Sequence, residues 1–106
     1  MPKYLITGSY TAEGIKGLMK DGGTKRLDAV RAAMKSVGGS VDAAYFALGE
    51  HDVYITVDAP DHAAIAAVAL AASASGAVRV RTTALMTAAE VDAAVKKAVT
   101  YTPPGR

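Results

Sequence analysis

Two neighbouring residues, His51 and Asp52, form the pair in this sequence that could act as catalytic machinery. A histidine ring that a carboxylate orients can serve as a general base. The pair lies in Gly49-Glu50-His51-Asp52, between two stretches with strand character, where glycine and aspartate are typical of a tight turn. Because adjacency alone is unspecific, the turn interpretation is favoured and the catalytic one is the weaker alternative.

Arg79 and Arg81 are the second candidate, because residues two apart on a strand share a face. Two guanidinium groups on one face can bind a carboxylate or a phosphate. The alternative, slightly favoured, is that they protect an edge strand or pair with acids across a dimer. Thr7, Tyr45 and Tyr54 are expected on the same face and complete the predicted ligand-binding set, although the tyrosines could equally fill an interface.

No cofactor and no metal site is predicted. The chain has no cysteine, which excludes thiol catalysis, zinc–thiolate sites and iron–sulfur clusters. His51 and His62 lie eleven residues apart, without the spacing that places two ligands on one helix face, and neither is expected to hold a haem. Asp58 and Asp61 are better explained as caps around Pro60. Phosphate-binding glycine loops and the Gly-x-Ser-x-Gly motif are absent.

Composition limits the class of protein further. The 106 residues suit one domain, and a hydrophobic content of 51% excludes disorder. The 12 basic and 10 acidic side chains are interspersed, which argues against a nucleic-acid partner. The most apolar stretch, 63–72, is too short for a membrane span of about 20 residues. Because the first residues do not resemble a signal peptide, we expect a soluble cytoplasmic protein.

Hydrophobic periodicity and chain-breaking residues divide the chain into strands and helices. Strands are expected at 3–10, 41–48, 53–58 and 78–85. Helices are expected at 11–21, 24–37, 60–75 and from 87 onward. Thr11 and Thr24 are the predicted N-caps of the first two helices, and Thr87-Ala88-Ala89-Glu90 fits a capping box. The last helix is expected to carry Val91, Val95 and Val99 on one face.

The order β-α-β-β-α-β with an extra C-terminal helix predicts an α+β fold of the ferredoxin-like type, with strand order 4-1-3-2. One domain is expected over 1–101, followed by a loose tail over 102–106. A two-residue turn at Glu50-His51 would pair Phe46 with Ile55 and turn Val53, Ile55 and Val57 toward the helices.

The opposite sheet face would then carry the tyrosines and arginines with nothing to cover them. The helix at 60–75 is almost uncharged, so even its outer side is apolar, whereas solvated helix faces are normally charged. Two separate apolar surfaces predict a homodimer or a larger closed assembly of this chain.

Several segments resemble the GYD-domain family. They are the hairpin 45–53 with 57–61, the opening residues 4–7 and 10–14, and the stretch 72–79 with 82–83. The motif Gly-x-Tyr-Asp that names the family is Gly49-Glu50-His51-Asp52 here, with His51 in place of the tyrosine. The resemblance implies a dimeric α+β barrel, in which two sheets pack face to face. The wider group of such barrels contains cofactor-independent monooxygenases, haem-degrading enzymes and small-molecule-binding regulatory domains, so the activity stays open.

Three functions follow in order of preference. The first is an oligomeric protein that binds a small organic molecule, expected to be anionic, between sheet and helices or within the barrel. The second is a cofactor-independent enzyme of the monooxygenase or isomerase type that uses His51 and Asp52. The third is a structural assembly module. The sequence leaves open whether the protein is an enzyme.

Overall fold

The computed structural model describes all 106 residues and contains one four-stranded sheet with four helices. The strands are β1 (Lys3–Tyr10), β2 (Ser40–Phe46), β3 (Val53–Asp58) and β4 (Val78–Leu85). The helices are α1 (Ala12–Asp21), α2 (Gly23–Ser36), α3 (His62–Ala74) and α4 (Ala88–Val95). The predicted α+β class with a C-terminal helix is therefore confirmed.

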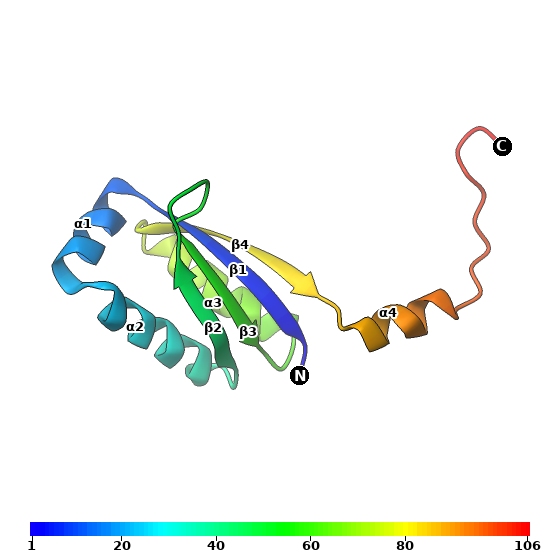
Figure 1. The fold of residues 1–106 in the computed structure, drawn as a ribbon, viewed down its shortest axis with the longest axis horizontal. Coiled ribbons are helices and arrows are strands. Elements are labelled where there is room, and N and C mark those ends of the chain that lie inside the picture. Colours follow the sequence, from blue (N-terminus) through cyan, green and yellow to red (C-terminus); the bar gives the residue numbers. More distant parts are fainter.

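The antiparallel sheet has the order β2-β3-β1-β4, which is the predicted order 4-1-3-2 read from the other edge. The first three helices lie on one face of this sheet, and α4 stands apart from it (Figure 1). The other face has no helix over it. The central strands β1 and β3 thus have one covered face and one open face.

The core follows from strict alternation along the two central strands. Tyr4 and Ile6 of β1 are buried beside Val53, Ile55 and Val57 of β3. The helices add only two fully buried side chains to this cluster, which are Met34 from α2 and Ile65 from α3. The prediction that the valines and isoleucine of β3 face the helices is confirmed.

The predicted hairpin register is wrong by two residues. Phe46 pairs with Val53, not with Ile55, and β2 ends at Phe46 rather than at residue 48. The cause is Asp52, whose N–H donates to the Gly8 carbonyl at 2.8 Å while its carboxylate accepts from the Tyr10 N–H at 2.8 Å. These bonds to β1 make Asp52 part of a longer loop, 47–52. The two-residue shift keeps Ala44 and Phe46 on the predicted, helix-facing side, whereas Leu48, also expected there, falls in the loop and is exposed to solvent. A bulge between Val41 and Ala43 further changes the alternation at the start of β2.

Three of the predicted helix starts hold and one is wrong. Thr11 accepts from the Gly14 N–H, and Thr87 forms the predicted capping box with Glu90. Asp61 caps α3 through the Ala64 N–H, whereas Asp58, the other predicted cap, lies 3.1 Å from the Lys3 ammonium group instead. Thr24 is not a cap, because α2 already begins at Gly23 after a turn. That turn requires a positive φ of 81° at the preceding glycine, which glycine adopts without strain.

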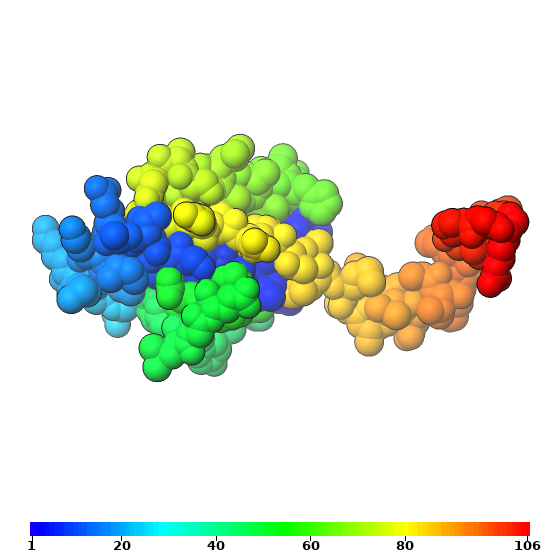
Figure 2. All heavy atoms as spheres, turned by 90° about the horizontal axis from the view of Figure 1, so that it is seen from above, coloured from blue at the N-terminus to red at the C-terminus, as the bar shows by residue number.

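The C-terminal part, α4 with the residues that follow it, leaves the body of the protein (Figures 1 and 2). The molecule therefore measures 56 × 33 × 23 Å. Helix α4 ends at Val95, so Val99 lies outside the helix that was predicted to include it. None of the helices is both long enough and apolar enough to cross a membrane.

The close approach of α1 to the start of β4 gives a first prediction. A Cβ at Gly14 would collide with the Ala77 carbonyl oxygen, whereas a Cβ at Gly17 would meet nothing within 4 Å. We expect Gly14→Ala to lower the free energy of unfolding by about 1–3 kcal/mol through overpacking. Gly17→Ala should raise it by about 0.5–1 kcal/mol, because alanine favours the helix. Urea unfolding measures both, and equal shifts in the two variants would contradict the close contact.

Candidate functional site

A cavity of about 630 Å³ lies between the covered sheet face and helices α1, α2 and α3. We call it the inner pocket. Its volume falls within the range of small-molecule sites, about 300–1,000 Å³. Of its 24 lining residues, 16 are hydrophobic. It exists because the helices present small side chains to the sheet, among them Gly14 and Gly17 of α1 and Ala67 and Ala71 of α3.

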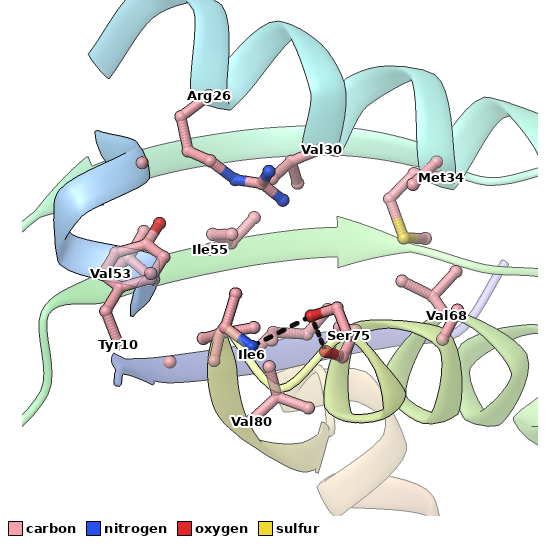
Figure 3. Close-up of a pocket in the computed structure, with 18 of the residues that line it drawn as sticks. Ile6, Tyr10, Arg26, Val30, Met34, Val53, Ile55, Val68, Ser75 and Val80 are labelled. Carbon is pink, nitrogen blue, oxygen red and sulfur yellow. Dashed lines mark hydrogen bonds between the residues drawn. The ribbon is translucent and has the colours of Figure 1, made fainter. Parts of the chain in front are cut away.

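The floor and the walls of the inner pocket are apolar (Figure 3). Strands β1, β3 and β4 supply the floor with Ile6, Ile55 and Val80, and α2 and α3 face each other across it with Val30 and Val68. Such a lining favours a ligand with an apolar body, because burying apolar surface is the main favourable term.

One positive charge points into this apolar space. Figure 3 shows the Arg26 side chain reaching from α2 toward the sheet, with Tyr10 at the same end of the pocket. Burial raises the pKa of the Tyr10 hydroxyl, an effect that the nearby Arg26 charge partly opposes. The hydroxyl is therefore a neutral hydrogen-bond donor at pH 7. Arginine and tyrosine donors beside an apolar cavity suit an anionic group on the ligand.

Of the other polar residues of the inner pocket, Glu13 at the start of α1 has no ion-pair partner, and Ser75 and Asp21 are less available for a ligand. The Ser75 hydroxyl donates to the Ala72 carbonyl at 2.6 Å and accepts from the Ala77 N–H at 3.2 Å. Asp21 lies 3.7 Å from the Lys25 ammonium group. Arg26 is the only cationic residue of the lining.

The open sheet face gathers all five residues of the predicted ligand-binding set. Tyr45 pairs with Tyr54, Tyr54 with Thr7, and Thr7 with Arg81, so four of them form one row across the sheet. Arg79 stands two residues further along β4. Neither arginine forms an ion pair within the chain, and none of the five residues lines the inner pocket. The predicted set is thus brought together, on the face opposite the pocket.

The structure gives His51 and Asp52 different partners. The His51 Nδ1 lies 3.1 Å from the Ser9 hydroxyl oxygen, and the His51 ring packs edge-on against Tyr54. Asp52 bonds the backbone of β1 instead, so the carboxylate does not orient the histidine. The Ser9–His51 contact was not foreseen, because it depends on the long loop that Asp52 creates.

The second histidine, His62, contacts Tyr4 rather than the residues around His51. The His62 Nδ1 and the Tyr4 hydroxyl oxygen form a hydrogen bond of 2.7 Å, and the two rings meet edge to face. This bond satisfies the hydroxyl of a tyrosine that is only 2% exposed. His62 therefore has a structural role with Tyr4, and it does not share a site with His51, which contacts Ser9.

Arg26 and Tyr10 were not among the site residues predicted from the sequence. A signal for Arg26 was present, since it precedes Val30 by four residues and Met34 by eight and therefore lies on the inward face of α2. A positive charge on the apolar face of a helix indicates either snorkelling or a ligand.

Comparison with known proteins identifies a family. The model of the GYD domain matches residues 4–95, which is most of the chain. A search among proteins of curated function finds no match.

The raised pKa of Tyr10 leads to a prediction for alkaline solution. The folded state holds the phenol proton above the ordinary pKa of 10.0, so stability is lost as the pH rises from there through the folded pKa. In Tyr10→Phe, the loss of unfolding free energy between about pH 9 and about pH 11 should be smaller than in the wild type. Tyr101→Phe, in the exposed tail, should behave like the wild type. Identical pH slopes for all three proteins in urea unfolding would contradict the assignment.

Proposed function

This chain belongs to the GYD-domain family, and we propose that it binds a small organic anion with an apolar body in the inner pocket. The observation that supports this most directly is a mostly apolar cavity of about 630 Å³ with one cation, Arg26, in its lining. An unbranched or aromatic carboxylate fits this chemistry better than a nucleotide, because the pocket has no second cation for a phosphate chain.

In the proposed complex the apolar part of the ligand packs on Ile6, Ile55 and Val80, and its carboxylate faces Arg26 and the Tyr10 hydroxyl. Burial of the apolar part drives binding, at about 25 cal/mol per Å². The charge-assisted hydrogen bonds to Arg26 set the orientation and select anions over neutral molecules of the same shape.

Calorimetric titration with straight-chain carboxylates of about six to twelve carbons tests this proposal. Arg26→Met should weaken carboxylate binding by about tenfold or more, because a hydrogen bond to a charged group is worth about 1.5–3 kcal/mol. The matching alcohols should lose nothing. Arg31→Met is the control on the same helix, since that guanidinium lies 3.6 Å from Asp28 and does not line the pocket.

A third variant separates the inner pocket from the open face. If Arg81→Met weakens carboxylate binding and Arg26→Met does not, the anion binds on the row of Thr7, Tyr54 and Arg81, as the sequence analysis predicted. If no carboxylate binds the wild type at millimolar concentration, the proposed function is wrong.

We also propose that two copies of the chain associate through their open sheet faces. The support is that this face carries Tyr45, which is 72% exposed, beside Tyr54 and the half-buried Leu5 and has no helix over it. A stable interface buries about 800 Å² on each partner, and a four-stranded face is an extended surface of the required kind. Pairing would enclose Arg79 and Arg81 between the sheets.

Analytical ultracentrifugation tests the association. The wild type should sediment as a dimer or a larger closed assembly at tens of micromolar. Tyr54→Lys should weaken association by at least about tenfold, because it adds another unpaired cation to a face that already carries Arg79 and Arg81. Ala32→Lys, on the exposed side of α2, is the matched control and should leave the assembly unchanged. A monomeric wild type would rule the dimer out.

A further inference from the structure

The C-terminal arm, defined as residues 86–101, carries apolar side chains that nothing in its own chain covers. Val95 and Val99 are 75% and 77% exposed, and Met86 and Tyr101 are similarly open to solvent. Helix α4 has only eight residues. An isolated helix of that length is marginal in water, so its stability depends on packing against another surface.

A second uncovered apolar surface lies on the body of the protein. Between α3 and the edge strand β4 there is a groove of about 390 Å³, which we call the α3–β4 groove. Ile65, Ala66 and Ala69 line it from α3, and Thr82 and Ala84 from β4. Tyr4 and His62, which are hydrogen-bonded to each other at 2.7 Å, complete the lining. Helix α3 has no charged residue between Ala63 and Ser75, so no charge on that stretch opposes the docking of an apolar helix.

The arm and the groove match in size and polarity. Val91 and Val95 are four residues apart and share one face of α4, while Glu90 and Asp92 point to its other sides. A groove lined by alanines leaves room for valine side chains, since helices approach closely where the facing side chains are small. Docking would bury the valines and leave both carboxylates in solvent.

The connection between β4 and α4 directs the arm away from its own groove. The linking residues Met86 and Thr87 follow β4 directly and include no glycine or proline that would favour a reversal. Thr87 is extended, with φ −75° and ψ 162°, and its capping box with Glu90 holds that geometry. The arm accordingly continues away from the sheet (Figures 1 and 2). The groove it can reach is therefore on another molecule.

We propose that the C-terminal arm of one chain docks through Val91 and Val95 into the α3–β4 groove of a second copy. Exchange of arms in both directions forms a two-fold interface in which each chain contributes one arm and one groove. The groove lies on the helix side of the sheet, so this contact is separate from an association of open faces. It does not depend on the proposed ligand.

Because the natural chain has no cysteine, engineered cysteines can test the contact without interference. Val95→Cys in a tagged full-length chain is co-expressed with Ala66→Cys in an untagged chain, and the mixture is mildly oxidised with copper–phenanthroline in air. We expect a disulfide-linked heterodimer on a non-reducing gel. Ala32→Cys, another exposed helical alanine but outside the groove, replaces Ala66→Cys in the control and should give at least about fivefold less heterodimer.

Two results would overturn the proposal. One is a heterodimer yield with Ala66→Cys no higher than with Ala32→Cys. The other is a disulfide that forms within a single chain when Val95→Cys and Ala66→Cys are combined, since this would show that the arm folds back on its own body.

A second pair of variants keeps the test independent of disulfide geometry. In a Tyr54→Lys background, which weakens the open-face contact, Val95→Glu places a carboxylate on the docking face of α4 and should weaken the remaining association by at least about tenfold in sedimentation. Ala93→Glu places the same group on the opposite face of the helix and should leave association unchanged. Equal association of these two variants contradicts the proposal.

Discussion

The small side chains of the helices that cover the sheet are the constraint on which the inner pocket depends. Alanines on α3 and glycines on α1 bring these helices to the sheet without filling the space above it. The start of α1 is also tied to the loop before β4, because the Thr11 N–H donates to the Ala77 carbonyl at 3.0 Å and the Thr11 hydroxyl to the Gly76 carbonyl at 2.8 Å. Interiors are normally close-packed, so the cavity remains because alanines and glycines line it where another protein would have larger side chains.

Sequence reasoning predicted the features that repeat along the chain. Alternation placed Val53, Ile55 and Val57 on the covered face, and local side-chain caps located the starts of three helices, because both signals arise within a few residues. It failed where one residue bonds a distant strand. The turn chemistry around Asp52 suggested a two-residue hairpin, and only the bonds from Asp52 to β1 explain the longer loop.

One part of the candidate site could also be predicted from the sequence, and another part could not. Period-two spacing was enough to place Arg79 and Arg81 together, and the strand order then brought Thr7, Tyr45 and Tyr54 onto the same face. The space between sheet and helices was expected from the sequence as one of two possible ligand sites, but the residues that line the inner pocket were not, because a cavity is the volume that side chains from several elements fail to fill. No local sequence pattern predicts the size of such a cavity. The one sequence feature that indicated the pocket was Arg26, a positive charge on an otherwise apolar helix face.

At the end of β1, neighbouring residues contact both the open sheet face and the inner pocket. Gly8 and Tyr10 bond Asp52 through the backbone, Ser9 bonds His51 on the open face, and the Tyr10 side chain enters the inner pocket. The side chains of Ser9 and Tyr10, which are successive residues of β1, therefore point to opposite faces of the sheet. A ligand that contacted Tyr10 and a partner chain that contacted His51 would both act on the end of β1, which Asp52 holds with two hydrogen bonds of 2.8 Å. The aspartate of the family motif thus has a structural role here, and it is the residue through which the loop, the strand and both surfaces are joined.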